Sequence, residues 1–282
     1  MIFDGAARDW GCCRQWSLSY FADKYGDDLV YCEDAFQTLR DVSISQRRGS
    51  SDYLQFYALL QRHPELLVDL DLGWLKEHRN PNHLTFDQGF QAFIGNANTN
   101  PTPLHNANDA NLFIQVSGKK HWIFYPSAFT AAVDPPPTHS EYRTIKLGQP
   151  HFDPFSPDFD RFPMFKYLDG LEAVLKPGDI LWNPAYTWHA VRNLEDSTFG
   201  VGYRWVTPAS CFQLEPLYAA LDCLATKPPI WRSFGLSRQS FQLLFLSQSN
   251  ADNKLPGYDD FHKQVLTSFP EYKKLMAEAG LR

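Results

Sequence analysis

The fold is decided by residues 102–126, which read TPLHNANDANLFIQVSGKKHWIFYP. His105 stands just before two apolar runs that have the composition of β-strands, and Ser117-Gly118 between these runs favours a tight hairpin. A second histidine, His189, follows a Lys-Pro-Gly-Asp turn and again stands on the approach to an apolar run. Two histidines presented by strands of one barrel suggest a metal site.

Both stretches resemble the cupin-like JmjC group of iron(II)- and 2-oxoglutarate-dependent oxygenases. Proteins of this group fold as a double-stranded β-helix, and an HxD motif together with a distant histidine holds their iron. A threonine three residues before the first histidine, an asparagine six after it and a lysine fifteen after it commonly hold the 2-oxoglutarate. The resemblance covers residues 5–206. It implies these ligands: His105 and His189 for iron(II), and Thr102, Asn111 and Lys120 for 2-oxoglutarate.

One position departs from the family pattern, because Ala107 stands where the HxD aspartate is expected. A carboxylate in such a site offsets part of the iron charge and leaves three coordination positions open, whereas an alanine cannot ligate. The metal would then be held by the two histidines and the cofactor, with water or halide at the vacant position, or by a substitute carboxylate such as Asp109. Asp109 is the weaker option, since a loop aspartate is more often a solvated turn former.

Lys120 is expected to point into the barrel. It alternates with Trp122 and Phe124 along its strand, so the three side chains share one face, and His121 faces the opposite way. A lysine inside a barrel needs an anion, and the distal carboxylate of 2-oxoglutarate meets that need. The alternative is a surface lysine that extends its amine into water.

Arg204 is the second cationic candidate for cofactor binding. Its neighbours on the same strand face are Gly200 and Gly202, which leave space for a ligand to approach. A guanidinium in that place can clamp a carboxylate with two parallel hydrogen bonds. The alternative is an ordinary ion pair at the rim of the barrel.

The composition limits the class of protein. The chain has 282 residues, enough for one large domain, and 15% of them are aromatic, which suits a β-rich core. The net charge of −6 provides no basic field for nucleic acid. The 5 cysteines show no CxxC spacing and are expected to be reduced. No signal region or long apolar run is present, so we expect a soluble, intracellular, cytoplasmic protein without membrane contact.

The amino-terminal part is expected to brace the barrel. Ser17 fits a helix N-cap, and Gly26 fits a helix stop. The elements expected before the histidine stretch are a helix between these two residues, a strand at 29–31, a helix over 51–60, an irregular connection over 63–83 and a buried strand at 90–95.

The part beyond residue 126 begins irregularly, since residues 127–169 are rich in proline and have no clear period. A stretch of this length inside a domain is usually functional or a lid. The elements expected after it are strands at 171–175 and 180–182 joined by a hairpin-like turn at Pro177-Gly178, strands at 187–191 and 199–205, and helices over 214–224, 237–246 and 259–279.

We therefore predict a mainly β protein with additional α-helices. Residues 1–206 are predicted to form a double-stranded β-helix of the cupin or JmjC-like jelly-roll type, with N-terminal helical support and the 127–169 insertion. Residues 207–282 are predicted to form a helical appendage, which is a candidate surface for a homodimer.

The predicted function is that of an iron(II)- and 2-oxoglutarate-dependent oxygenase that hydroxylates a small molecule or a protein side chain. Two alternatives stay open. An iron halogenase would use the vacant position beside Ala107 for a halide ion. A catalytically inactive cupin would bind a ligand or a partner without turnover.

Overall fold

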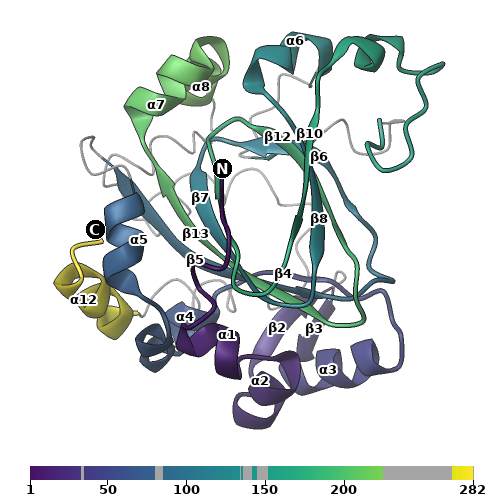
Figure 1. Ribbon diagram of the computed structural model, residues 1–282. Coiled ribbons are helices and arrows are strands. Elements are labelled where there is room, and N and C mark those ends of the chain that lie inside the picture. The colour runs from purple at the N-terminus through teal and green to yellow at the C-terminus, as the bar shows by residue number, and fades with distance from the viewer. Residues whose placement is uncertain are drawn as a thin grey trace.

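The computed structural model describes residues 1–32, 35–79, 85–133, 135, 142–144, 152–224 and 269–281. In this part of the chain, two antiparallel sheets face each other and form the walls of a barrel (Figure 1). The arrangement confirms the predicted double-stranded β-helix.

The larger sheet carries the amino-terminal strand at one edge and β4 at the other. Its long central strands, β7 and β13, pair with each other along most of their length. The strands of this sheet, in spatial order, are β1 (Ile2–Phe3), β11 (Ile180–Asn183), β7 (Ala110–Ser117), β13 (Thr198–Val206), β5 (Phe86–Gly95) and β4 (Leu54–Tyr57).

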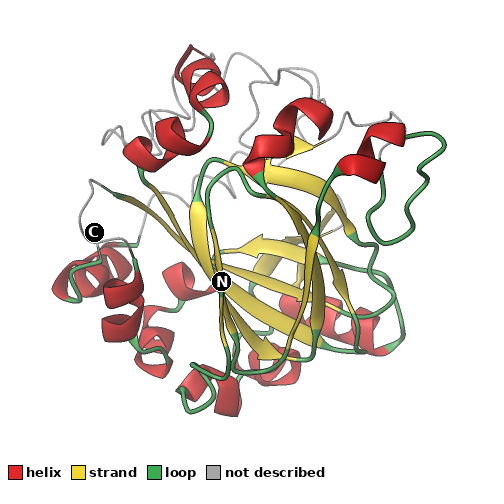
Figure 2. Cartoon of the chain, turned by 45° about the horizontal axis from the view of Figure 1, so that its top comes forward, coloured by secondary structure: helices red, strands yellow, loops and turns green. Residues whose placement is uncertain are grey.

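The smaller sheet carries both predicted histidine ligands on neighbouring strands, β6 and β12. It faces the larger sheet across the barrel interior (Figure 2). Its strands, in spatial order, are β10 (Leu171–Leu175), β8 (Lys120–Tyr125), β12 (Trp188–Asn193), β6 (Thr102–Ala107) and β9 (Tyr142–Thr144).

The two predicted hairpin turns are wrong, and the correction explains the barrel. Ser117-Gly118 joins β7 to β8, but these strands belong to different sheets. Strand β7 is buried along nearly its whole length and already pairs with β11 on one side and β13 on the other, so no edge remains for β8. Pro177-Gly178 likewise leads from β10 in one sheet to β11 in the other. Both turns are corners between sheets.

The corner at residue 118 needs a backbone conformation and a close approach that only glycine allows. The φ of Gly118 is +66°, in the left-handed region that side chains disfavour. A Cβ on this residue would lie 2.2 Å from the carbonyl oxygen of Ser197, which no side chain can tolerate. Glycine is therefore required for the chain to cross at this point.

Amino-terminal helices cover the outer face of the larger sheet, as predicted (Figure 1). The Ser17 hydroxyl accepts a hydrogen bond of 3.1 Å from the Tyr20 amide and caps the first predicted helix. Phe21 of that helix packs edge-on against Phe199 of β13, with ring centroids 5.3 Å apart. The elements here are α1 (Gly11–Gln15), α2 (Leu18–Lys24), the hairpin of β2 (Leu29–Cys32) and β3 (Ala35–Thr38), and α3 (Leu39–Arg47).

The predicted helix over 51–60 is wrong. Strand β4 occupies most of this segment and pairs with β5, and the helix α4 (Leu59–Arg62) begins only after it. Leu54 and Tyr57 are buried while Phe56 is exposed, so the apolar residues that suggested a helical period lie on a strand with a register shift. Pairing with β5 provides this backbone with partners that a local pattern does not reveal.

The predicted irregular connection over 63–83 is also partly wrong. It contains the 3-10 helix η1 (Pro64–Asp69) and the helix α5 (Leu72–His78), while residues 80–84 lie outside the described residues. The Asp71 carboxylate accepts a hydrogen bond of 2.9 Å from the Trp74 amide and caps α5. Both helices begin with standard start signals, since a proline opens one and an aspartate caps the other.

The described parts of the 127–169 insertion cover the outer face of the smaller sheet. Phe152 stacks on Phe165 with ring centroids 3.8 Å apart, and both pack with Tyr125 and Trp188 of the sheet. The insertion contains η2 (Ser127–Phe129), α6 (Thr130–Val133), β9 and η3 (Pro163–Tyr167). Its described residues are therefore mostly a cover for the sheet.

Helices follow the barrel, as expected. The predicted helix over 214–224 is divided into α7 (Pro208–Leu214) and α8 (Pro216–Leu224). The predicted helix over 237–246 lies outside the described residues, and of the one over 259–279 only α12 (Pro270–Glu278) is described. The boundary between residues 206 and 207 and the homodimer stay predictions. Within the described ranges, no helix is both long and apolar enough to cross a membrane.

Candidate functional site

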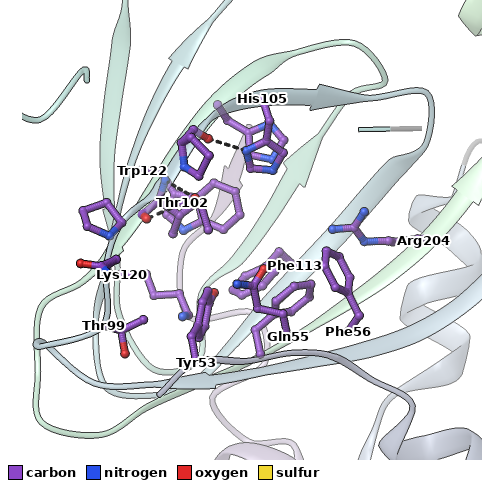
Figure 3. Close-up of a pocket in the computed structure, with 16 residues that line it drawn as sticks. Tyr53, Gln55, Phe56, Thr99, Thr102, His105, Phe113, Lys120, Trp122 and Arg204 are labelled. Atoms are coloured by element: carbon purple, nitrogen blue, oxygen red, sulfur yellow. Dashed lines mark hydrogen bonds between the residues drawn. The ribbon is translucent and has the colours of Figure 1, made fainter. Parts of the chain in front are cut away.

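A cavity of about 460 Å³ opens inside the barrel between the two sheets (Figure 3). This volume is in the usual range of about 300–1,000 Å³ for small-molecule sites. Its walls include five aromatic side chains: Tyr53, Phe56, Phe93, Phe113 and Trp122. Five of the six predicted site residues line it: Thr102, His105, Lys120, His189 and Arg204.

His105 and His189 lie directly opposite each other on β6 and β12, with ring centroids 4.2 Å apart. The Nδ1 atom of His105 lies 2.7 Å from the Pro103 carbonyl oxygen, and Nδ1 of His189 lies 2.8 Å from the Thr187 carbonyl oxygen. A carbonyl only accepts, so each Nδ1 carries the proton and donates it. The lone pair of each imidazole is therefore on Nε2, which is a usual metal-binding atom of histidine.

Both imidazoles are neutral at physiological pH. Burial, with a smaller contribution from the nearby charge of Arg204, lowers the pKa of His105 to about 4. Burial also lowers the pKa of His189 well below its usual value, with additional contributions from His105 and Arg204. Neutral imidazoles keep their lone pairs available for a metal.

The described residues provide no third protein ligand beside these histidines. No group of three or more His, Cys, Asp or Glu side chains in the described part of the chain is placed to hold a metal ion. Asp109, the candidate substitute, instead forms an ion pair of 3.2 Å with Arg204. Ala107 is buried on β6 and is not among the described residues that line the cavity.

Lys120 points into the barrel, as its alternation with Trp122 predicts. Its side chain is 1% exposed, and its Nζ donates a hydrogen bond of 2.5 Å to Oδ1 of Asn193. The same amine lies 5.3 Å from the centre of the Tyr53 ring. Burial lowers the pKa of Lys120 to about 7. The alternative of a solvated surface lysine is therefore wrong for this residue.

His121 faces away from the cavity, as expected. Its Nε2 lies 3.2 Å from a carboxylate oxygen of Glu172 on the neighbouring strand β10, and that carboxylate is largely exposed. His121 therefore offers a matched histidine outside the candidate site.

Thr102 and Asn111 differ in their relation to the cavity. The Thr102 hydroxyl accepts a hydrogen bond of 2.9 Å from the Val191 amide and lies 3.2 Å from its carbonyl oxygen, so it ties β6 to β12 at the cavity wall. Asn111 is buried on β7, opposite Asn183 and Arg204, and is not among the described residues that line the cavity. Its role in holding 2-oxoglutarate stays a prediction.

Arg204 combines the two alternatives that its sequence left open. It forms an ion pair with Asp109, but it does so in the cavity wall, with its side chain 8% exposed. Its guanidinium lies 5.9 Å from the ring centre of Phe56 and 5.7 Å from that of Phe93. The charge is thus desolvated, compensated and packed between aromatic rings.

Among the cavity residues that the sequence reasoning did not propose, three come from one segment: Tyr53, Gln55 and Phe56. They lie in or next to β4, which the apolar spacing assigned to a helix. Phe56 has a φ of +56°, in a region that large side chains rarely adopt. A register shift between Leu54 and Tyr57 accommodates this residue, and no short sequence signal for such a bulge is present.

A protein-family model described as a cupin-like domain matches residues 32–210. Lysine-specific demethylase 8 of Xenopus tropicalis is 27% identical over 222 residues, which cover 73% of this chain and 47% of the relative. The protein of the same name from Danio rerio is 30% identical over 228 residues, covering 73% and 52%. The human bifunctional peptidase and (3S)-lysyl hydroxylase JMJD7 is 24% identical over 235 residues, covering 68% and 72%. The chain spans about half the length of the two demethylases.

Proposed function

The chain belongs to the cupin-like domain family, and on this basis we propose that it is an iron(II)- and 2-oxoglutarate-dependent oxygenase with a two-histidine metal site. One observation carries the proposal: two neutral imidazoles and a buried lysine line the same cavity. The names of the relatives include a lysyl hydroxylase and lysine demethylases, which are oxidative activities of those proteins.

The histidine pair fits a divalent metal in its donor chemistry. The backbone carbonyls of Pro103 and Thr187 fix the Nδ1–H tautomer, so the lone pair of each imidazole is on Nε2, a donor atom of the right kind. The missing carboxylate lowers the number of protein donors to two among the described residues. We propose that His105 and His189 hold the iron and that 2-oxoglutarate provides further oxygen donors.

The Lys120 end of the cavity fits a carboxylate. A lysine amine with a lowered pKa gains an interaction partner when an anion binds, and its proton is then held by the new ion pair. Asn193 and Tyr53 position the amine from two sides. We propose that Lys120 holds the distal carboxylate of 2-oxoglutarate, with Thr102 at the adjacent wall.

When bound, iron(II) and 2-oxoglutarate supply the oxidising chemistry with dioxygen. The protein side chains orient the reactants and keep water out of the cavity. Phe93, Phe113 and Trp122 form buried apolar walls around the histidine pair and the lysine. These walls strengthen every charge interaction inside the cavity, because they lower its local dielectric.

A binding protein without turnover is the second candidate, and the lack of a third protein ligand among the described residues is the observation that favours it. The halogenase alternative needs a halide pocket beside Ala107. The described cavity lining does not include that residue, so this alternative has no support from the cavity.

The proposed function is tested with the full chain loaded with iron(II) under anaerobic conditions and then exposed to 2-oxoglutarate and dioxygen. We expect iron to bind and succinate to form. His105→Ala and His189→Ala should each abolish iron binding, whereas His121→Ala, a histidine outside the cavity, should leave it unchanged. Iron binding without succinate formation supports the inactive binding protein. Unchanged iron content in both ligand variants overturns the site.

A further inference from the structure

The cavity has a second cationic end at Arg204, which the sequence offered as a further cofactor contact and to which the proposed function assigns no part of 2-oxoglutarate. Lys120 and Arg204 lie on opposite sides of the cavity, with the aromatic residues between them (Figure 3). If Lys120 holds 2-oxoglutarate, as the proposed function requires, the Arg204 end is left for the substrate. The inference below rests on that proposed function and concerns the chemical class of the substrate.

The arrangement of Arg204 and Asp109 presents positive charge to the cavity. Arg204 is among the residues that line the cavity, whereas Asp109 is not. The carboxylate holds the Nη1 atom of the guanidinium at 3.2 Å and is itself mostly buried. Asp109 therefore fixes the guanidinium plane, and the surface met by a ligand is the cation. A planar guanidinium is suited to two parallel hydrogen bonds with a carboxylate.

The walls beside this cation are flat and apolar. The Phe56 and Phe93 rings meet edge to face with centroids 5.4 Å apart, and the Phe113 ring lies 5.9 Å from that of Phe93. Phe56 keeps its place at the cavity with an unfavourable positive φ, and such strain is found mainly where a function requires it. Its side chain is 42% exposed, so part of the ring is at the surface.

Gly202 leaves space between these groups. A Cβ built on this residue would lie 3.7 Å from Phe113, 3.7 Å from Phe93 and 3.8 Å from Nε of Arg204, which are ordinary contact distances. A Cβ at this position would therefore fit in contact with all three residues, and the further atoms of a larger side chain would press on them.

We propose that Arg204, with Phe56 and Phe93, is the substrate-recognition site, and that the substrate is a small carboxylic acid with a flat apolar body. The carboxylate would pair with the guanidinium, and the apolar body would lie against the phenylalanine rings. This placement puts the substrate in the cavity that the histidine pair also lines.

The test uses phenylacetate and its neutral analogue phenylacetamide as probes. Each is titrated calorimetrically into the full chain, kept free of oxygen and saturated with iron(II) and 2-oxoglutarate. A charge-assisted hydrogen bond makes a difference of roughly ten- to a hundredfold in affinity, so phenylacetate should bind at least about tenfold more tightly than phenylacetamide. Equal affinity of the two probes, or no binding of either, overturns the proposal.

Variants assign this preference to Arg204. Arg204→Leu combined with Asp109→Leu removes the cation and its counter-ion together, so no buried charge is left alone, and the preference for phenylacetate should disappear. Gly202→Val changes no charge, and it should weaken both probes because its added methyl groups press on Phe93, Phe113 and Arg204. A preference that persists in the double variant contradicts the inference, as does unchanged affinity in Gly202→Val.

Lys120→Met separates this inference from the proposed function. The variant should lose 2-oxoglutarate affinity but keep the preference for phenylacetate over phenylacetamide. If 2-oxoglutarate affinity does not change, the proposed cofactor site is wrong, whatever the probes do. If the phenylacetate preference is lost in Lys120→Met, Lys120 binds the carboxylate of the probe and the Arg204 assignment is wrong.

Discussion

The two cationic ends of the cavity are built differently. Lys120 has an amide oxygen as its hydrogen-bond partner, and within the described residues no carboxylate forms an ion pair with it. Arg204 has the carboxylate of Asp109 at 3.2 Å. Burial lowers the pKa of Lys120 to about 7, whereas a guanidinium keeps its proton throughout the physiological range. The lysine end needs a bound anion to keep its charge, and the arginine end is charged in advance.

This difference has a thermodynamic consequence. A buried charge with a neutral partner is costly, so a ligand that neutralises it gains much of the desolvation free energy already spent in folding. A buried charge with its own counter-ion is less costly, and a ligand there gains mainly from geometry. The lysine end is therefore suited to binding an anion tightly, and the arginine end to selecting an anion of the right geometry. Five predictions test this comparison.

The largest effect is expected from removing the counter-ion at the arginine end. Asp109→Asn leaves a buried guanidinium without its carboxylate, and breaking a buried pair in this way costs about 3–5 kcal/mol of unfolding free energy. Denaturant unfolding of the variant and of wild type measures the difference. Glu172→Gln is the matched control, because the Glu172 carboxylate is 74% exposed and its loss should have little effect. If both variants lose a similarly small unfolding free energy, the Arg204 end does not depend on its counter-ion and the proposed difference between the two ends is wrong.

The second effect concerns the cofactor. Lys120→Met removes the amine while keeping an unbranched apolar side chain, and 2-oxoglutarate affinity should fall by roughly a hundredfold, since a charge-assisted hydrogen bond in a buried site is lost. Calorimetric titration of the iron-loaded protein without oxygen gives the two dissociation constants. Lys119→Met is the neighbouring control, because Lys119 pairs with Glu195 at the surface. Equal losses in both variants would contradict a specific role for Lys120.

The third effect lies between the two ends, at the histidine pair. Ala107→Asp should restore a set of two histidines and one carboxylate and tighten iron binding by about ten- to a hundredfold. Anaerobic iron titration and succinate release are measured side by side with wild type. In a halogenase the same change should end chlorination and allow hydroxylation. Weaker iron binding in the variant would show that the missing carboxylate is not what limits the site.

The fourth effect is a difference in pH dependence. Below its pKa of about 7 the free Lys120 amine is already charged, so 2-oxoglutarate affinity is complete there. Above it, binding must restore the proton, and the affinity should fall by roughly tenfold per pH unit until the raised pKa of the bound lysine is reached. Phenylacetate affinity at Arg204 should stay constant over the same range. Parallel pH profiles for the two ligands would contradict the comparison.

The smallest effect is expected from removing the partner at the lysine end. Asn193→Ala deletes a single hydrogen-bond acceptor, and Lys120 can become neutral in response, so the unfolding free energy should fall by only about 1 kcal/mol. The expected sign of the change in the pKa of Lys120 is downward, since an acceptor for its charged form is lost. A loss as large as that in Asp109→Asn would show that both cations depend equally on their partners.

The sequence predicted which side chains point into the cavity better than it predicted which distant residues pair with each other. Alternation along one strand was enough to place Lys120 and Trp122 inside and His121 outside, because side-chain direction in a strand has a period of two. The Arg204–Asp109 ion pair joins residues 95 positions apart, and no local pattern indicates such a partner. For Arg204 the sequence left a ligand clamp and an ion pair open as alternatives, and it did not identify Asp109 as the counter-ion.

The same limit explains the errors in the fold. A Ser-Gly or Pro-Gly pair indicates that the chain turns, but whether it turns within a sheet or between sheets depends on which strand edges are already paired. Strand β4 was missed for a related reason, since its pairing with β5 and the unusual backbone of Phe56 are tertiary features. Three of the missed cavity residues, Tyr53, Gln55 and Phe56, follow from that one error.

The corners at Gly118 and Gly178 also govern how the protein reaches its native state. Each corner leads the chain into the opposite sheet, so β7 can complete its pairing only when β11 and β13 are present. Both of these strands lie far from β7 along the sequence. Contacts of this kind give a high contact order, which slows folding. During synthesis, the strand that carries His105 can pair with β9 first, but it lacks β12 until the strand that carries His189 has left the ribosome.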